Sequence, residues 1–175
     1  MRNQDDASRT RECSDGAEAI QPKGVRIGDD VKIDDDIVMW TNIQIGSGSR
    51  VRARFIGDNV TIGYKVTIGL KCSIGSGVSV GDNTVLGQGC VIGDNVTIGD
   101  NVTIGDKVRI GEGSLIDGNI EIGDKTEIGV RASIGYGAEI EGNLFVLDGE
   151  VISNWQVVSI INGLRWPPYQ NPSLT

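Results

Sequence analysis

The sequence has no histidine among its 175 residues. This absence removes the side chain that most often acts as a general base near neutral pH and as a metal ligand. No stretch approaches 18 consecutive apolar residues and the N-terminus has no apolar segment, so we expect neither a membrane span nor a signal peptide. The three cysteines are too few and too scattered, with Cys13 in a polar segment, for a disulfide scaffold. A reducing, cytoplasmic location is therefore expected.

Aromatic residues are scarce at 5%, there are four prolines, and basic residues are outnumbered, with 16 Lys and Arg against 24 Asp and Glu. The resulting net charge of −8 has the wrong sign for general binding to nucleic acid or to an anionic membrane, and we expect neither partner. What the chain has in excess is glycine, with 26 residues. So much glycine with so little proline excludes both collagen and a disordered Pro/Gly-rich chain.

A six-residue repeat accounts for the glycine. From Ile56 to Ile152 every sixth residue is aliphatic, which makes 17 positions without an exception, and glycine follows directly at 13 of them. The unit reads V-x-I-G-D-N, in which V-x-I alternates as a half-buried strand does and G-D-N is turn chemistry. Asn or Gly accepts a left-handed backbone there at low cost. Because one unit cannot bury its apolar side alone, we expect the units to stack as an elongated solenoid of parallel strands.

This tandem pattern over residues 25–152 resembles the hexapeptide-repeat family of transferases. The resemblance implies an all-β chain that folds as a left-handed parallel β-helix, a three-sided solenoid of about seven coils with 18 residues in each. A right-handed β-solenoid is the structural alternative.

The chain divides into three parts. Residues 1–24 lack the period and form a polar N-terminal tail that we expect to be flexible, residues 25–152 form the β-helix, and residues 153–175 form a C-terminal cap or interface segment. Such a cap would cover strand edges of the last coil that would otherwise recruit another chain. The candidate cap or interface aromatics are Phe145, Trp155, Trp166 and Tyr169.

The repeat slips once, where the step from Val51 to Ile56 is five residues. The slip coincides with a cluster of three arginines, Arg50, Arg52 and Arg54. Because alternate residues of a strand point to the same side, we expect the three guanidinium groups to emerge together. They would then either bind a phosphate or carboxylate, or pair with the acidic run at 34–36 on the neighbouring coil or on the next subunit, and we favour the pairing.

One face of the predicted prism carries an outward row without a charge. Counting every 18 residues, the row consists of Thr61, Ser79, Thr97, Leu115, Ser133 and Val151. Proteins of the family that the chain resembles are commonly homotrimers, so this row is a candidate self-association face. We expect a homo-oligomer, with a trimer favoured and coil-end assembly as the other route. Two alternatives stay open: a bland face of Ser and Thr without a partner, and a hydroxyl ladder that binds ice.

Other side chains also recur one coil apart. The stacked corner carboxylates are Asp82 with Asp100, Asp94 with Glu112, and Asp106 with Asp124. We attribute them to turn preference, with lysines as countercharge, and predict no metal site. Cys72 and Cys90 occupy equivalent inward positions, where a disulfide is geometrically possible but two free thiols in the core are favoured.

The resemblance implies an acyltransferase that uses an acyl-CoA donor, but the residues depart from that expectation. Such enzymes typically use a histidine base and often carry a loop that interrupts the coils, whereas this chain has no histidine and no insertion from Ile56 to Ile152. We therefore predict a non-catalytic structural, assembly or interaction module with no catalytic residue and no cofactor. The alternative is an acyltransferase-like relative, for instance a sugar N-acyltransferase whose amine substrate arrives unprotonated, with a donor groove between subunits near the three arginines. An ice-binding solenoid is a minor alternative.

Overall fold

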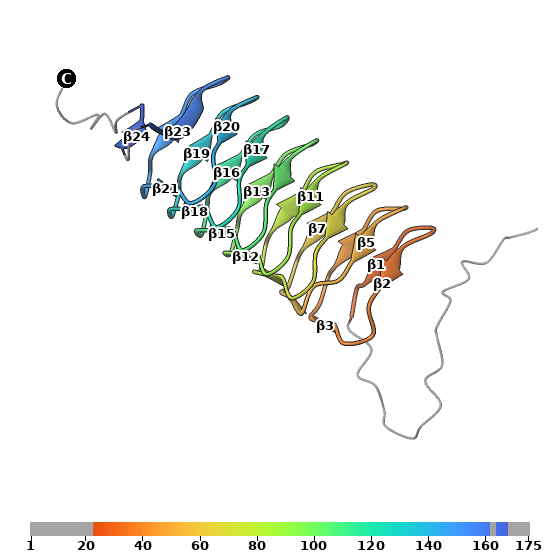
Figure 1. Ribbon diagram of the computed structural model, residues 1–175. Coiled ribbons are helices and arrows are strands. Elements are labelled where there is room, and N and C mark those ends of the chain that lie inside the picture. Colours follow the sequence, from red (N-terminus) through yellow and green to blue (C-terminus); the bar gives the residue numbers. More distant parts are fainter. Residues whose placement is uncertain (1–22, 162–163, 168–175) are drawn as a thin grey trace, which may run out of the picture.

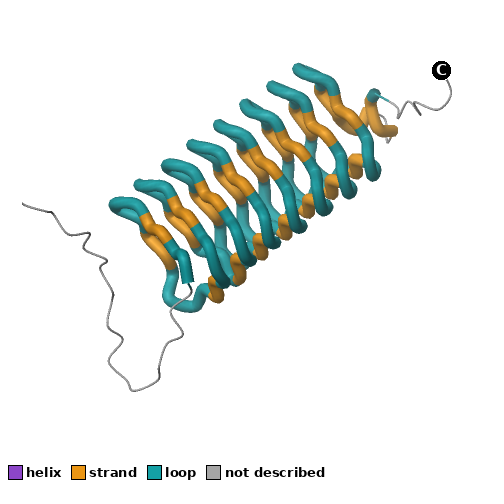
Figure 2. The backbone as a smooth tube through the Cα atoms, turned by 180° about the vertical axis from the view of Figure 1, so that it is seen from behind, coloured by secondary structure: helices purple, strands orange, loops and turns teal. Residues whose placement is uncertain are grey.

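A computed structural model of the chain describes residues 23–161 and 164–167. These residues form three short strands per coil, and the coils stack into an elongated three-sided prism (Figures 1 and 2). The prism is a left-handed parallel β-helix of about seven coils, so the right-handed alternative is wrong. No helix occurs in the described ranges, and hence none that could cross a membrane. Most of the predicted tail, residues 1–22, and the last residues, 168–175, lie outside the described part of the chain.

Each side of the prism is one sheet. Sheet A contains β1 (Arg26–Ile27), β4 (Gln44–Ile45), β7 (Thr61–Ile62), β10 (Ser79–Val80), β13 (Thr97–Ile98), β16 (Leu115–Ile116), β19 (Ser133–Ile134) and β22 (Val151–Ile152). Sheet B contains β2 (Lys32–Ile33), β5 (Arg50–Val51), β8 (Thr67–Ile68), β11 (Val85–Leu86), β14 (Thr103–Ile104), β17 (Glu121–Ile122), β20 (Glu139–Ile140), β23 (Val157–Ile161) and β24 (Leu164–Trp166). Sheet C contains β3 (Val38–Met39), β6 (Phe55–Ile56), β9 (Ser73–Ile74), β12 (Val91–Ile92), β15 (Arg109–Ile110), β18 (Glu127–Ile128) and β21 (Phe145–Val146). We call their outer surfaces the A, B and C faces.

Neighbouring strands pair in parallel with residues one coil apart in register, as Ser79 does with Thr97. The outward residues of each sheet therefore form one straight row, about 4.8 Å apart. The exception is β24, which pairs antiparallel with β23 at the C-terminal end.

The core is a continuous column of aliphatic side chains. All 17 repeat positions from Ile56 to Ile152 are buried, as the period predicts. The column is open at its N-terminal end, where Ile27 of the first coil is 50% exposed because no described coil lies over it. Burial of this column at about 25 cal/mol per Å² of apolar surface holds the prism together and leaves the outward rows free for other roles.

The corners use the left-handed backbone that the repeat predicts, but with a wider choice of residues. Asn101 has a φ of 57° and Gly77 one of 70°, as expected for Asn and Gly. Lys107 and Lys125 adopt the same conformation, with φ of 58° and 57°. A lysine at positive φ costs more than Gly or Asn, so these corners are held by the coils on both sides rather than by local preference.

Candidate functional site

The corner aspartates bind the backbone of the preceding coil. Oδ1 of Asp82 accepts a hydrogen bond from the Tyr64 N–H at 2.7 Å, and Oδ1 of Asp100 accepts one from the Asp82 N–H at 2.7 Å. Asp94, Asp106, Asp124 and Asp148 repeat the contact on other coils, at 2.7–2.8 Å. The carboxylates thus satisfy N–H groups that the turns leave free, a role that the sequence alone did not indicate. Within the described ranges no group of three His, Cys, Asp or Glu side chains gathers to hold a metal ion.

Asp58 shows the electrostatic effect of such a contact. Its Oδ1 accepts hydrogen bonds from the Thr41 hydroxyl at 2.6 Å and from the Thr41 N–H at 2.9 Å. Because these bonds stabilise the ionised form, they hold the pKa of the Asp58 carboxyl below its usual value.

The three arginines do not share one strand, so the prediction that they alternate along it is wrong. Only Arg50 lies in β5, which ends at Val51, while Arg52 and Arg54 lie in the shortened corner before β6. The strands from β1 to β22 are two residues long, too short for three arginines to alternate along one of them. Nε of Arg52 lies 3.4 Å from Oδ2 of Asp34, an ion pair with the acidic run on the neighbouring coil. Anion binding by these arginines stays a prediction.

The uncharged row lies on the A face as one ladder. The residues from Thr61 to Val151 are register partners on successive strands from β7 to β22. Val151 is 69% exposed at its C-terminal end. Towards the N-terminus the same row continues with Gln44 and then Arg26, so a charge stands at its first position. Self-association through this face stays a prediction.

A shallow groove of about 620 Å³ runs along the C face and was not foreseen from the sequence. Its apolar walls include Val91, Phe145 and Leu147, and its charged residues include Arg109 and Glu127. Two exposed apolar corner residues, Val130 and Leu147, line it beside the row of sheet C. A signal was present in the sequence, since Val130 stands where corners most often have Asp and Leu147 stands where most have Gly.

Arg109 and Glu127 are the charged side chains nearest the middle of the groove. They are register partners on β15 and β18, between Val91 on one side and Phe145 on the other. Arg109 is exposed and Glu127 is half-buried. The two ion pairs found in the described part of the chain involve neither residue, so both charges can face a ligand.

Cys72 and Cys90 are free, buried thiols, as favoured. Each donates a hydrogen bond to a carbonyl of the next coil, Cys72 to Gly87 at 3.0 Å and Cys90 to Gly105 at 3.1 Å. The neighbouring Cys72 thiol and burial both raise the pKa of Cys90. A neutral thiol of this kind fills a core position and does not serve as a nucleophile.

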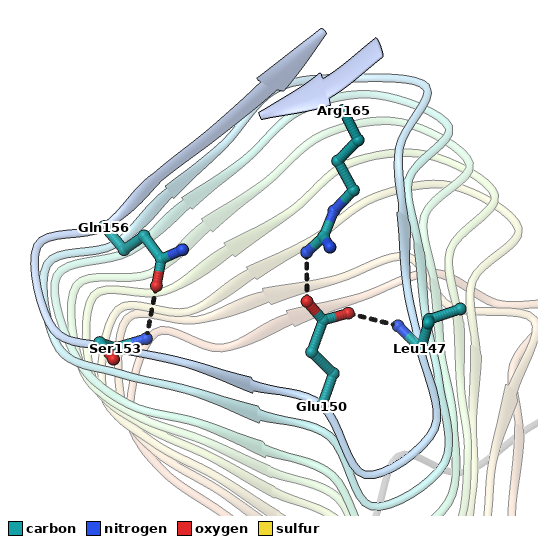
Figure 3. A network of polar contacts seen from close by, with 5 residues as sticks. All are labelled: Leu147, Glu150, Ser153, Gln156 and Arg165. Atoms are coloured by element: carbon teal, nitrogen blue, oxygen red, sulfur yellow. Dashed lines mark hydrogen bonds and ion pairs between the residues drawn. The ribbon is translucent and has the colours of Figure 1, made fainter. Parts of the chain in front are cut away.

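The C-terminal end contains a buried ion pair (Figure 3). Glu150 occupies the inward position that Ala132 and Ser114 hold on the two preceding coils, and it is only 7% exposed. One of its oxygens accepts the Leu147 N–H at 2.8 Å, and the other pairs with the Arg165 guanidinium of β24. The pair thus ties the terminal hairpin of β23 and β24 to the last coil. A glutamate at an inward repeat position was the sequence signal for it.

The candidate cap aromatics do not gather over the core. Phe145, Trp155 and Trp166 are 62%, 70% and 58% exposed, and Tyr169 lies outside the described residues. Trp155 makes an edge-on contact with Tyr136, with 5.3 Å between ring centroids. A cap or interface role for these residues stays a prediction.

Comparison with known proteins shows a short family match and solved structures that share this fold. Residues 71–106 match the family described as bacterial transferase hexapeptide (six repeats). No curated protein matches the chain in sequence. The UDP-N-acetylglucosamine acyltransferase of Francisella novicida is similar with a TM-score of 0.63 and 19% identity, over 86% of this chain and 70% of that chain.

Two further solved structures share the fold. LpxA from Acinetobacter baumannii is similar with a TM-score of 0.52 and 17% identity, over 79% of this chain and 70% of that chain. A histidine-to-alanine mutant of GDP-perosamine N-acetyl transferase from Caulobacter crescentus, in complex with CoA and GDP-perosamine, has a TM-score of 0.51 and 16% identity. The alignment covers 70% of this chain and 53% of that chain, about half of its length. The family match and these folds confirm the resemblance to the hexapeptide-repeat family.

Proposed function

We propose that the chain is an acyltransferase-like relative that binds an acyl thioester, such as an acyl-CoA, in the groove of the C face. The observation that carries the proposal is this groove, about 620 Å³, in a fold shared with acyl- and acetyltransferases. It spans four strands from β12 to β21, about 14 Å at the usual strand spacing, which suits an extended chain. Val91, Phe145 and Leu147 would contact the apolar part of the donor, and Arg109 a phosphate.

The missing histidine restricts the acceptor in this proposal. A hydroxyl acceptor needs a base to remove its proton, whereas an amine that arrives unprotonated attacks the thioester carbonyl directly. The C–N bond forms, the C–S bond breaks, and the proton lost by nitrogen passes to the leaving thiolate or to the Glu127 carboxylate. The solved Caulobacter mutant holds CoA and GDP-perosamine with one histidine replaced by alanine, so ligand binding in that protein does not require that histidine. We therefore propose N-acylation rather than O-acylation.

Calorimetric titration of the full chain with CoA and acetyl-CoA tests the proposal. We expect saturable binding that the variant Phe145→Asp weakens at least about tenfold, because it adds an anionic group to an apolar wall. Leu115→Asp is the matched control, since Leu115 is similarly exposed but lies on the A face. Absence of binding at millimolar ligand by a folded sample would overturn the proposal, as would equal binding by both variants.

A non-catalytic structural or interaction module is the second candidate. It is favoured by the absence of histidine and by coils that run without an insertion from Ile56 to Ile152. Within this candidate the A face mediates homotrimer formation. The variant Thr97→Glu would then reduce the mass measured by light scattering, while Ser73→Glu on the C face would leave it unchanged. An unaltered mass for Thr97→Glu would reject the A face as the interface.

A further inference from the structure

The B face carries opposite charges at its two ends. Its outward residues, one per coil and in register, are Lys32, Arg50, Thr67, Val85, Thr103, Glu121, Glu139 and Val157. From Lys32 to Glu139, basic residues occupy the first two positions, acidic residues the last two, and uncharged residues the middle. Val157 of β23 follows the acidic pair. Neither the acyltransferase-like function nor the A face uses this row.

Each end of the row sets like charges directly beside each other. Lys32 and Arg50 are register partners on β2 and β5, and Glu121 and Glu139 are register partners on β17 and β20. Like charges in such positions destabilise a sheet. All four side chains are exposed, and neither ion pair of the described residues includes any of them. The isolated chain therefore holds two repulsive pairs that no described residue compensates by an ion pair.

Outward residues at equal distances from Val85 in the two directions either carry opposite charges or are both uncharged. Lys32 and Glu139 lie three coils from Val85 in opposite directions, Arg50 and Glu121 lie two coils away, and Thr67 and Thr103 lie one coil away. We propose that the B face binds the B face of a second copy of the chain, antiparallel to it. The twofold axis lies in the interface, along the strand direction, at the level of Val85.

In this dimer Lys32 faces Glu139 of the partner subunit and Arg50 faces Glu121 of the partner subunit, and symmetry forms each pair twice. The two repulsive pairs of each chain thereby become four attractive pairs. Val85, which is 40% exposed, meets its own copy at the axis and excludes water between the uncharged middle parts. A parallel arrangement would set each basic pair against itself, so the charges select the antiparallel dimer.

The corners beside the B face mostly agree with this arrangement. An axis along the strands brings each corner to the same corner of the partner. Lys65, before β8, then lies at the level of Asp100 of the partner subunit, and Lys71, after β8, at the level of Asp106 of the partner subunit. Like charges meet at the outermost level, where the run 34–36 faces Glu141 of the partner subunit, and at the axis, where Asp82 faces its copy. They also meet after β8, where Lys71 holds the same turn position as Lys107 of the partner subunit. Asp34 already pairs with Arg52, which reduces the first repulsion.

Charge reversal tests the proposal on the full chain by sedimentation equilibrium at low salt. One variant carries Lys32→Glu and Arg50→Glu, and the other carries Glu121→Lys and Glu139→Lys. Either variant makes all facing charges alike at both ends, so we expect the dissociation constant to rise at least about tenfold. The control Glu112→Lys with Glu127→Lys changes the net charge as the variant with Glu121→Lys and Glu139→Lys does, but outside the B face. Circular dichroism verifies that each variant is folded.

Two further samples, a fourfold variant and a mixture of the two double variants, test whether the partner is a second copy of the chain. The chain with all four substitutions has the same order with every sign exchanged, so it should associate as the wild type does. An equimolar mixture of the two double variants should form a heterodimer. Raising the salt from 0.05 M to 0.5 M should weaken the wild-type dimer, because exposed charges are screened over about 10 Å already at 0.1 M.

Three results would overturn the proposal. They are a wild-type mass that shows no association at low salt, double variants that associate as tightly as the wild type, and a fourfold variant or mixture that stays dissociated although folded. The last result would indicate a partner other than this chain. If the A face also forms a trimer, the same variants should reduce the mass of the larger assembly to that of the trimer.

Discussion

Replacing Arg165 by methionine would test how the terminal hairpin is held. Arg165→Met keeps an unbranched apolar stem but removes the guanidinium that pairs with Glu150. Glu150 would then remain at an inward position, 7% exposed, with the Leu147 N–H as its one remaining partner there. We expect a loss of stability, because a buried carboxylate would be left without its countercharge.

The burial of the pair sets the size of the effect. Removing one partner of a buried ion pair costs about 3–5 kcal/mol. The Arg165 side chain keeps 18% of its exposure, so water reaches the site in part and the lower end, about 3 kcal/mol, applies. The loss should be local, because each coil of a solenoid contacts only its neighbours. An opening equilibrium that shifts by about 3 kcal/mol changes roughly a hundredfold.

Amide hydrogen exchange measures this local opening. Protection of amides in β21, β22 and β23 should fall about a hundredfold in Arg165→Met, while amides in β10 to β15 keep theirs. Arg109→Met, which replaces an exposed arginine, is the matched control and should leave the protection of both sets of amides unchanged. Replacing both Glu150 and Arg165 by leucine should restore most of the protection, because no buried charge remains. A fall of less than about threefold, or an equal fall in all coils, would refute this account of the hairpin.

In the corners, Asp100→Ala should lower the free energy of unfolding by about 1 kcal/mol in urea denaturation, because the Asp82 N–H loses its acceptor. Asp100→Asn keeps an oxygen at that place and should leave the free energy of unfolding nearly unchanged. Thr41→Val should raise the pKa of Asp58 in an NMR titration, because its side-chain donor is lost. Since the folded-state pKa of Asp58 is lowered in the wild type, its contribution to stability is present at neutral pH and lost as the pH falls into the acidic range. The buried thiols of Cys72 and Cys90 should resist a thiol reagent at pH 8 until the protein unfolds. Rapid labelling of Cys72 or Cys90 in the native state, located by peptide mass spectrometry, would contradict their burial.

The inside of the prism was predictable because the repeat constrains it residue by residue. An aliphatic side chain at every sixth position has one place to go, and each of the 17 is buried. The left-handed corner residues were predictable in the same way for Asn101, but not for Lys107, which takes that backbone against its own preference. The handedness of the coil followed from the resemblance to the hexapeptide-repeat family, because a period of six is compatible with either hand.

The candidate sites were less predictable, because they depend on strand lengths and on neighbours in different sheets. The three arginines were assigned to one strand, but β5 ends at Val51 and the shortened corner separates them. The C-face groove combines Phe145 of a strand with Val130 and Leu147 of a corner, and no single 18-residue row contains all three. Glu150 was visible as a charge at an inward position, but its partner Arg165 lies beyond the last repeat, where the period gives no register.

Outward positions differ in principle from inward positions and from corner positions, and this difference indicates where to look for a function. Packing selects the inward residues and turn geometry selects most corner residues, so these positions carry less information about a ligand or a partner. The outward residue of each two-residue strand is free of both constraints, and its distance to the outward residue of the next strand is set at about 4.8 Å by the sheet. The order of side chains along a face is therefore a rigid pattern that the 18-residue count reads directly from the sequence. On the B face that order changes from basic to acidic about Val85, and it places like charges side by side at a cost to the isolated chain. A pattern that the fold does not require and that weakens the monomer is best explained by what the face binds.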